Sequence, residues 1–529
     1  MTLLSVQNLT LNIGPHPILH DVDLTVEAGK ITAITGESGS GKSMTALAIM
    51  GLLPKGSATT GTITFEGGDL LQTSEPDLCD IRGNDIGMVF QEPMTALNPV
   101  HTIGSQVAET IRIHTKASKS DAMAQAATML KRVGLEVPPD RYPHELSGGQ
   151  RQRVVIAMAI ALRPKLLIAD EPTTALDVTT QARILTLLQS LVDEFDMGLI
   201  LITHDLAVVA DVADTITVMQ QGRVVETGAA TRVLTQTQHP YTKALLAASS
   251  HQPAKQEPSA SQTPAPPGLV VQNVTRTYPL PRQNVFGPRP HFRALDDVSL
   301  TIAPGERVGL VGESGCGKST LTRAILGLED VQTGTITLDG DPVFASNRPN
   351  LSVRRKMQVV FQDPYGSFNP RHRVGRLVSE PWHLLENKPQ NGGDLIAQAL
   401  TDVGLTPSDA DKYIHEFSGG QRQRIAIARA LITQPDLIIF DEAVSALDVS
   451  VRAQILDLIA DLGTKRRLAY LFISHDLHVV RAVTDRVLVM QKGRIVEDGP
   501  TGQVYDTPQH PYTKELLAAA PHLPDFAEV

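Results

Sequence analysis

The chain has 529 residues and a formal net charge of −10, with 47 Lys and Arg against 57 Asp and Glu. That length is long for one compact core and predicts two domains, and the acidic balance argues against a nucleic-acid partner. Two cysteines are too few for a four-cysteine zinc or iron–sulfur centre, so neither is expected. The first residues lack the pattern of a signal peptide, and no apolar run approaches the ~20 residues that span a bilayer.

The chain repeats itself. GESGSGKS at 36–43 returns as GESGCGKS at 312–319, an offset of 276, and from Gln91 and Gln362 onward the offset is 271. A constant offset means one domain written twice, and we predict the domains at 1–250 and 269–529. Between them, residues 251–268 hold five prolines. This composition predicts an extended linker that reaches roughly 55 Å at about 3.1 Å per residue.

The first motif of each copy is a phosphate-binding loop (P-loop), GxxxxGK[ST], after an apolar strand (ITAIT, RVGLV). Its glycines let successive N–H groups converge on phosphate oxygens, and the following helix adds its dipole. The lysines would neutralise the β- and γ-phosphates and the serines would ligate Mg²⁺. The nucleotide-binding residues predicted here are Gly36, Ser38, Gly39, Gly41, Lys42, Ser43 and Met44, and Gly312, Ser314, Gly315, Gly317, Lys318, Ser319 and Thr320.

A second glycine pattern follows, LSGGQ at 146–150 and FSGGQ at 417–421, and each is predicted to open a long helix. Serine and two glycines at a helix start form another anion-binding arrangement. An ordinary serine-capped turn is the alternative for one copy, but RQR follows in both, which favours the anion site. These residues are Ser147, Gly148, Gly149 and Gln150, and Ser418, Gly419, Gly420 and Gln421.

Short apolar runs predict buried parallel strands at 166–170, 198–204, 437–441 and 469–475. Helical stretches such as 151–162 separate them, which favours an α/β fold with a largely parallel sheet. Asp170 and Asp441 end two of these strands, where a carboxylate can hold Mg²⁺. The next residues, Glu171 and Glu442, can polarise an attacking water as general bases.

The motifs in this order resemble the ABC ATPase family, over nearly the whole chain outside the linker. They are the P-loop, a glutamine after an apolar strand (VFQEP, VVFQDP), SGGQ, Asp-Glu, TALD or SALD, and a strand-ending histidine. The resemblance implies two P-loop NTPase domains, each with a mostly parallel sheet core and a helical subdomain, packed head to tail. It also implies that Gln91 and Gln362 sense Mg²⁺ and the attacking water, and that His204 and His475 contact the γ-phosphate of ATP.

The same resemblance implies that each ATP lies between the P-loop of one domain and the SGGQ of the other, with Asp177 and Asp448 crossing the interface. The P-loop of the first domain would thus share its ATP with Ser418, Gly419 and Gly420, and that of the second with Ser147, Gly148 and Gly149. The catalytic residues expected are Glu171, Glu442, His204, His475, Gln91 and Gln362. The Mg²⁺ ligands expected are Ser43, Gln91, Asp170, Ser319, Gln362 and Asp441.

The two copies differ at the position where this family places an aromatic ring under adenine. Tyr278 stands there in the second copy and Ile13 in the first. Base stacking contributes about 1–3 kcal/mol, so we expect weaker nucleotide binding at the first P-loop. The alternative is that another residue, such as His16, covers the base. Ala443 replaces a proline after the second Asp-Glu pair but leaves both carboxylates in place.

Several longer strings resemble the fused two-domain ATP-binding subunits of the oligopeptide/dipeptide (microcin C-type) importer family. They are FQEPMTALNP, FQDPYGSFNPR and QHPYTK, which stands near the end of both copies. The resemblance implies two transmembrane permease partners, an extracytoplasmic solute-binding protein as an indirect partner, and a peripheral place on the cytoplasmic side of a bacterial inner membrane. Segments 92–115 and 363–385 would receive permease helices, or would be solvated loops. The role of HPYT stays open.

Other functions remain as alternatives. A twin-ABC ATPase of translation or DNA repair would usually carry a charged helical arm or zinc cysteines, whereas this chain has a Pro-rich linker and two cysteines. A nucleotide-gated scaffold without turnover is disfavoured because both glutamates are present. The cargo is open as well, since importers of nickel complexes, opines and glutathione share similar ATPases.

Overall fold

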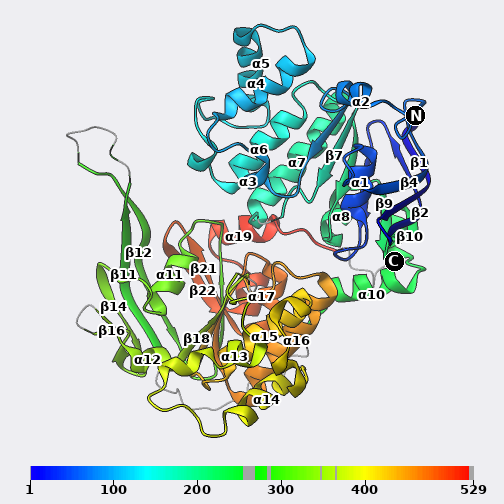
Figure 1. Ribbon diagram of the computed structural model, residues 1–529. Coiled ribbons are helices and arrows are strands. Elements are labelled where there is room, and N and C mark those ends of the chain that lie inside the picture. The colour runs from blue at the N-terminus through cyan, green and yellow to red at the C-terminus, as the bar shows by residue number, and fades with distance from the viewer. Residues whose placement is uncertain are drawn as a thin grey trace.

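Two similar α/β domains make up the structure, a computed structural model that describes residues 2–174, 176–253, 268–280, 282, 288–345, 348–363 and 366–523 (Figure 1). Most of the linker predicted at 251–268 lies outside the described residues. None of the helices in these ranges is both long and apolar enough to cross a bilayer.

A six-stranded sheet forms the centre of the first domain, in the order β10-β9-β3-β8-β7-β6. Its strands are parallel except for the β9–β10 pair. A smaller antiparallel sheet, β2-β1-β4-β5, packs beside it. The strands are β1 (Thr2–Ile13), β2 (His16–Glu27), β3 (Ile31–Thr35), β4 (Ser57–Phe65), β5 (Gly68–Asp69), β6 (Ile86–Val89), β7 (Leu166–Asp170), β8 (Gly198–Ile202), β9 (Thr215–Gln220) and β10 (Arg223–Ala229).

The helices of the first domain include an arm, α4 and α5, that stands away from the second domain in Figure 1. The helices are α1 (Lys42–Ile49), α2 (Glu75–Ile81), α3 (Pro93–Ala96), α4 (Ile103–His114), α5 (Lys119–Arg132), η1 (Pro143–Glu145), α6 (Gly148–Ala159), α7 (Val178–Phe195), α8 (Leu206–Val212), α9 (Ala230–Thr235) and α10 (Pro240–Ser249).

The second domain repeats this plan, with the sheets β18-β19-β20-β13-β21-β22 and β12-β11-β14-β15 and a short pair, β16-β17. Its strands are β11 (Leu269–Pro279), β12 (His291–Ile302), β13 (Arg307–Val311), β14 (Thr333–Leu338), β15 (Asp341–Pro342), β16 (Phe344–Ala345), β17 (Arg348–Pro349), β18 (Met357–Val360), β19 (Leu437–Asp441), β20 (Ala469–Ile473), β21 (Arg486–Gln491) and β22 (Arg494–Pro500). Its helices are α11 (Lys318–Ile325), α12 (Leu351–Arg355), α13 (Val374–Val378), η2 (Glu380–Leu384), α14 (Gly392–Asp402), η3 (Pro407–Asp411), η4 (Ile414–Glu416), α15 (Gly419–Leu431), α16 (Val449–Arg466), α17 (Leu477–Val483), α18 (Thr501–Asp506) and α19 (Pro511–Ala518).

The strands predicted from short apolar runs are confirmed. Four of them, β3, β7, β13 and β19, have the predicted bounds, and β8 and β20 end two residues early, before the strand-ending histidines. The predicted helix at 151–162 is α6, which begins earlier because the Ser147 side chain caps it. The α/β class is therefore as expected, because continuous apolar runs suit strands that helices cover on both faces.

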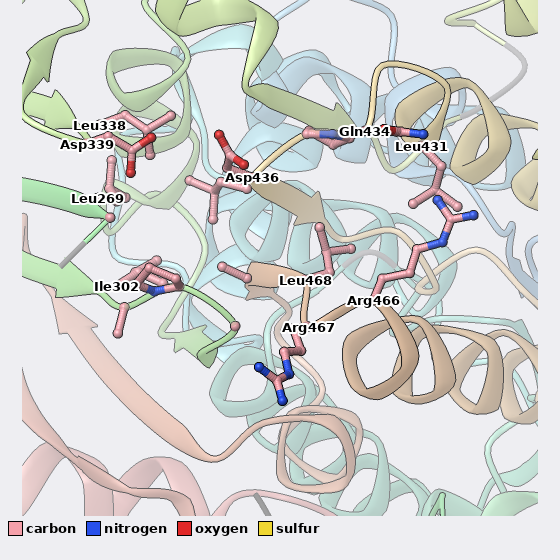
Figure 2. Close-up of a pocket in the computed structure, with 17 residues that line it drawn as sticks. Leu269, Ile302, Leu338, Asp339, Leu431, Gln434, Asp436, Arg466, Arg467 and Leu468 are labelled. Carbon is pink, nitrogen blue, oxygen red and sulfur yellow. The ribbon is translucent and has the colours of Figure 1, made fainter. Parts of the chain in front are cut away.

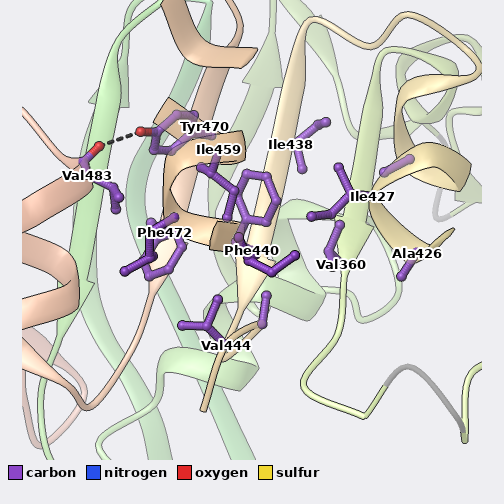
Figure 3. Close-up of a cluster of buried hydrophobic side chains, with 14 of the residues drawn as sticks. Val360, Ala426, Ile427, Ile438, Phe440, Val444, Ile459, Tyr470, Phe472 and Val483 are labelled. Atoms are coloured by element: carbon purple, nitrogen blue, oxygen red, sulfur yellow. Dashed lines mark hydrogen bonds between the residues drawn. The ribbon is translucent and has the colours of Figure 1, made fainter. Parts of the chain in front are cut away.

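Aromatic rings fill the centre of the second domain (Figure 3). Phe440 on β19 packs edge-on against Tyr470 of β20, with ring centroids 5.7 Å apart, and also contacts Phe472. All three side chains are fully buried. The Tyr470 hydroxyl donates to the Val483 carbonyl, so burying this polar atom leaves no unpaired donor. The sheet thereby becomes a rigid platform for the loops at its edge.

The last helix of each domain packs against the other domain. Helix α10 lies along α16, and α19 lies along α7. The α19 helix, red in Figure 1, is visible between the two domains. Ion pairs join Arg183 to Glu515 at 3.1 Å and His251 to Asp457 at 2.7 Å across these contacts. The two domains therefore pack head to tail, as the family resemblance implies.

Candidate active site

Each P-loop connects the carboxyl end of a central strand to the helix that follows, β3 to α1 and β13 to α11. At the first glycine of each loop, the backbone leaves no room for a side chain. A Cβ on Gly36 would lie 2.1 Å from the Met219 carbonyl oxygen, and one on Gly312 would lie 2.2 Å from that of Met490. Gly41, which precedes α1, has a φ of 104° that favours glycine. The loop is therefore a backbone cradle of the kind that suits phosphate.

The P-loop lysines are buried and hold the loop closed on itself. The Lys42 ammonium donates to the carbonyls of Gly36 and Glu37, both at 2.8 Å. Lys318 makes the equivalent bonds at 2.6 and 2.9 Å. Burial lowers the pKa of Lys42, although nearby carboxylates, Glu171 first among them, oppose the shift. A buried cation without an ionic hydrogen-bond acceptor among these partners is suited to a stronger anionic partner such as phosphate.

A hydroxyl and a carboxylate meet beside the first P-loop. The Ser43 hydroxyl donates to Asp170 Oδ1 at 3.2 Å. Burial raises the pKa of Asp170, and burial together with the neighbouring Glu442 raises that of Asp441. Oxygen ligands of this kind fit Mg²⁺, and a cation would favour the ionised carboxylates.

Glu171 and Glu442 hold unusual backbone conformations directly after β7 and β19. Their φ angles are 47° and 52°, in the left-handed region that non-glycine residues rarely adopt. Such conformations cost of order 1–3 kcal/mol and cluster at functional sites. Both glutamates have this conformation at the same place in their copies, directly after the strand.

Three side chains surround the Glu171 carboxylate. Gln91 Nε2 and the Thr174 hydroxyl both donate to Oε2 at 2.9 Å, and His204 Nδ1 lies 3.3 Å from Oε1. Burial alone would raise the pKa of Glu171, but the bonds from His204, Thr174 and Gln91 outweigh it and lower the pKa to about 2. Glu171 is therefore ionised at neutral pH. Sequence positions far apart, including Gln91 and His204, meet here because their strands are parallel neighbours.

The glutamate carboxylate of the second copy is held less tightly than that of the first. His475 Nδ1 lies 3.6 Å from Glu442 Oε1, and this contact, opposed by burial, lowers the pKa of Glu442. Among the hydrogen bonds of the described residues, none joins Gln362 to Glu442, whereas Gln91 does bond Glu171. The two predicted catalytic sets therefore share their parts but differ in how tightly the glutamate is held.

Each P-loop also receives a loop from the other domain. Asp448 Oδ1 accepts from the Ser38 N–H at 2.6 Å, and Asp177 Oδ2 accepts from the Ser314 N–H at 3.4 Å. The Thr179 hydroxyl donates to Glu313 Oε1 at 2.6 Å, and the Ser450 hydroxyl donates to Glu37. The crossing of Asp177 and Asp448 that the resemblance implied is thus confirmed in both directions.

A cavity of about 680 Å³ opens around the second P-loop. It is bounded mainly by the second domain, but Leu176 and Asp177 come from the first. Its remaining lining residues are Ser314, Lys318, Ser319, Phe361, Gln362, Asp363, Gly366, Ser367, Asp441, Glu442 and His475. The cavity therefore gathers the predicted lysine, both carboxylates, the glutamine and the histidine in one space. Ser147, Gly148 and Gly149 are not among its lining residues.

The SGGQ segments open helices, as predicted, and their serines cap these helices. Ser147 accepts from the Gln150 N–H at 3.3 Å, while Gln150 Oε1 accepts from the Ser147 N–H at 3.0 Å, and Ser418 and Gln421 make the same pair. A Cβ on Gly149 would lie 2.3 Å from Thr180 Cγ2. The SGGQ turn therefore packs closely on α7, the helix that follows Asp177 and the loop that reaches the opposite P-loop.

A second cavity, of about 510 Å³, lies in the second domain (Figure 2). It is lined by residues at the amino ends of β19 and β20, at the edge of the sheet opposite the P-loop. Two of its charged groups already have partners, since Lys356 binds Asp339 at 2.7 Å and Arg466 binds Asp402. In α/β sheets ligands bind at the carboxyl ends of strands, so this cavity is not the candidate site.

Comparison with known proteins decides the family. A model described as ABC transporter matches residues 19–174 and 295–445. The chain belongs to the ABC transporter family. A second model, described as oligopeptide/dipeptide transporter, C-terminal region, matches residues 225–270 and 496–527 of this ABC ATPase.

Relatives of this ABC ATPase extend over its whole length. The peptidoglycan transport ATP-binding protein YejF of Agrobacterium fabrum is 46% identical over 98% of this chain and 96% of its own. The glutathione import ATP-binding protein GsiA of Escherichia coli K12 is 46% identical over 95% of this chain and 86% of its own. Among solved structures, cbiO1 from Clostridium perfringens is 31% identical with a TM-score of 0.40, covering 44% of this chain and 90% of that one.

Tyr278, the expected adenine platform of the ABC ATPase, lies on β11 and is partly buried. The Arg276 guanidinium lies over its ring at 5.1 Å from the centroid, and its hydroxyl donates to Glu329. Ile13, at the matching place on β1, packs at the margin of a hydrophobic cluster. The tyrosine ring is thus held by two polar neighbours, whereas the partly buried isoleucine packs against the edge of the core.

The structure places several residues on the P-loops to which the sequence motifs assigned no role there. They are Glu37 and Glu313, which the opposite domain binds, Thr179 and Ser450, which bind them, and Tyr241 and Tyr512, whose hydroxyls reach the loops. The sequence feature that could have indicated them is repetition. Both copies contain the string GES, a hydroxyl residue two positions after Asp177 or Asp448, and the string HPYT.

Proposed function

We propose that this ABC ATPase is the energy-coupling subunit of a bacterial importer for peptides or peptide-like solutes. It would lie on the cytoplasmic side of the inner membrane, bound to two permeases that receive cargo from an extracytoplasmic binding protein. The observation that carries the proposal is the pairing of two P-loops in one chain, each engaged by the opposite domain. Two relatives that match at least 95% of this chain are named as peptidoglycan transport and glutathione import ATP-binding proteins.

In the proposed cycle ATP draws the two domains together. Lys42 and Lys318 would exchange their carbonyl partners for the β- and γ-phosphates, because a charged acceptor forms the stronger bond. The SGGQ turn of the opposite domain would then add its helix N-terminus to the γ-phosphate. Leu176 lines the cavity around Lys318, and its side chain would lie 3.6 Å from a Cβ on Gly148, so the turn neighbours a residue of the site.

The residues beside the P-loop support a Mg²⁺ site, with Ser43 and Asp170 in the first copy and Ser319 and Asp441 in the second. When bound, Mg²⁺ would neutralise phosphate charge. Gln91 and Gln362 complete the proposed ligand set. The raised pKa values of Asp170 and Asp441 mean that an incoming cation would favour loss of any proton held there.

Hydrolysis needs a group that orients water against the γ-phosphate. Glu171, with a pKa of about 2, is ionised and has Oε2 bonded to Gln91. We infer that the attacking water displaces the Gln91 amide from this carboxylate, which then accepts the water proton. His204 contacts the other carboxylate oxygen and so fixes the orientation of the Glu171 side chain, which is the proposed base. Glu442 and His475 would do the same in the second site.

Purification from the native membrane tests the function. We expect two permease chains to accompany the ATPase, and its turnover in vesicles to rise with binding protein and cargo. The cargo panel should contain di- and oligopeptides, glutathione, peptidoglycan peptides, a nickel complex and an opine. Recovery with ribosomes or DNA, without permeases, would instead support a twin-ABC ATPase of translation or DNA repair.

Two exposed apolar side chains mark the proposed docking surface for a permease in segment 92–115. Val100 is 73% exposed and Ile113 on α4 is 71% exposed. Replacing both with Asp puts charge into the proposed apolar contact, so we expect permease co-purification to fall about 10-fold or more, the cost of roughly 1.4 kcal/mol. Basal ATPase of the isolated chain should stay unchanged.

Leu351→Asp is the matched control for this surface. Leu351 is 56% exposed but lies outside both proposed docking segments. It should leave co-purification at the original level. Equal loss in this control, or no loss in the Val100 and Ile113 variant, would contradict the assignment of segment 92–115.

The adenine platform gives a further prediction. In chains with one P-loop lysine removed, the site with Tyr278 should bind ATP more tightly than the site with Ile13, by about 1–3 kcal/mol of stacking. Isothermal titration of Lys42→Ala and Lys318→Ala chains measures the difference, and Tyr278→Ile should abolish it. Equal affinities in the two single-site chains would refute the role of Tyr278.

A further inference from the structure

The HPYT tyrosines each reach back to the P-loop of their own domain. The Tyr241 hydroxyl accepts from the Glu37 N–H at 3.0 Å, and the Tyr512 hydroxyl accepts from the Glu313 N–H at 2.9 Å. Each partner lies about 200 residues away in sequence, and both copies make the same bond independently. Burial raises the pKa of both tyrosines, so these hydroxyls stay neutral acceptors.

The rest of HPYT builds the turn that aims the tyrosine. In the first copy the Glu226 carboxylate accepts from the N–H groups of Gln238 and His239, at 2.8 and 3.2 Å. His239 Nδ1 accepts from the Tyr241 N–H at 3.3 Å and caps α10. Pro240 opens that helix, where its missing N–H costs nothing. The second copy repeats these bonds from Glu497.

The hydrogen bond from the P-loop to the tyrosine involves a peptide group that the P-loop lysine also binds. The N–H of Glu37 and the carbonyl of Gly36 belong to one planar group. Tyr241 binds the N–H end and Lys42 binds the carbonyl end, at 3.0 and 2.8 Å. Any rotation of this peptide would break both bonds. The tyrosine therefore fixes the orientation of this peptide group. Lys42 must release the carbonyl of the same group in order to bind phosphate.

The helix that carries the tyrosine is docked on the other domain. Helix α10 lies along α16, which directly follows Asp448, and Asp448 accepts from the Ser38 N–H in the P-loop beside Tyr241. Helix α19 lies in the same way along α7, which follows Asp177. Each P-loop is thus contacted on two sides, by the HPYT tyrosine of its own domain and by the aspartate loop of the other domain. Both contacts depend on one helix of the other domain, α16 for the first P-loop and α7 for the second.

We propose that Tyr241 and Tyr512 are positioning residues, which hold the first P-loop peptide in the orientation that receives ATP and link that orientation to the docking of the two domains. The HPYT segment then connects the P-loop of its own domain to the helix that follows Asp448 or Asp177 in the other domain. We call this connection the strut. This inference rests on the proposed assignment of the P-loops as the ATP sites.

Tyr→Phe variants test the strut, because they remove only the hydroxyl. In the full chain, Tyr241→Phe combined with Tyr512→Phe should raise the KM for ATP about 3- to 10-fold, the worth of one net hydrogen bond, and leave kcat within about twofold. In Lys318→Ala chains, Tyr241→Phe should weaken ATP binding at the remaining site by the same factor. Titration of a fluorescent ATP analogue measures the second effect.

Tyr505→Phe is the matched control. The Tyr505 hydroxyl donates to the Leu477 carbonyl at 2.7 Å, away from the P-loop. This variant should lower the melting temperature but leave the KM for ATP unchanged. The proposal is wrong if the Tyr241 and Tyr512 variants behave like this control, that is, if they lower only the fraction of folded protein and leave the KM for ATP unchanged. A Lys42→Ala chain whose first site still binds ATP normally would instead refute the P-loop assignment.

Discussion

Glu171→Gln combined with Glu442→Gln will lower ATP turnover about 100-fold or more, the usual contribution of a general base, while ATP stays bound at both sites. Glutamine keeps the size of the side chain and an oxygen acceptor but cannot take a proton at neutral pH. The ionised Glu171, held by Gln91 and His204, is the group best placed to accept one. Phosphate release measures turnover, and retained radiolabelled ATP after rapid desalting measures trapping.

Single variants and one surface glutamate serve as controls. Glu171→Gln alone reports whether the second site turns over by itself, and Glu442→Gln alone reports on the first. Glu66→Gln removes a carboxylate that binds Lys165 on the surface and should change nothing. Fast hydrolysis in the double variant would show that neither glutamate is the base.

Loss of the P-loop lysines should have the second large effect. Lys42→Ala or Lys318→Ala removes a buried ammonium that now binds two loop carbonyls. A hydrogen bond to a charged group contributes about 1.5–3 kcal/mol, so ATP affinity at the altered site should fall roughly 10- to 150-fold. Calorimetric titration of each variant should find one strong site in place of two.

Lys30→Ala is the control for charge alone. Lys30 pairs with Asp214 at 2.8 Å on the surface and lies outside the P-loop. Its removal should leave two strong ATP sites. Two undiminished sites in Lys42→Ala would place the nucleotide elsewhere and would also remove the basis for the role of Tyr241.

Much of the fold could be predicted because its signals are local. A continuous apolar run that ends in a charged residue, such as LLIAD before Glu171, needs no distant partner to indicate a buried parallel strand. The same holds for Ser147, whose capping partner Gln150 is three residues away. The P-loop glycines could be placed because their backbone angles are required by the loop itself.

Other features of the site depend on contacts that no local pattern encodes. The left-handed conformation of Glu171 is invisible in the string ADEP. The bond between Gln91 and Glu171 forms because β6 and β7 are parallel neighbours whose carboxyl ends meet. Its counterpart in the second copy is not made, although the residues are identical, so the difference between the two sites is a matter of packing.

The sequence by itself determined that this chain carries two P-loop ATPase units of the ABC family, because motif order and repetition survive without coordinates. Only the tertiary structure decided what holds each P-loop. Ser38 meets Asp448 and Glu37 meets Tyr241, partners 410 and 204 residues away. The physical reason is that a hydrogen bond depends on distance in space. The Glu37–Tyr241 bond needs the packing of one domain, and the Ser38–Asp448 bond needs both domains docked.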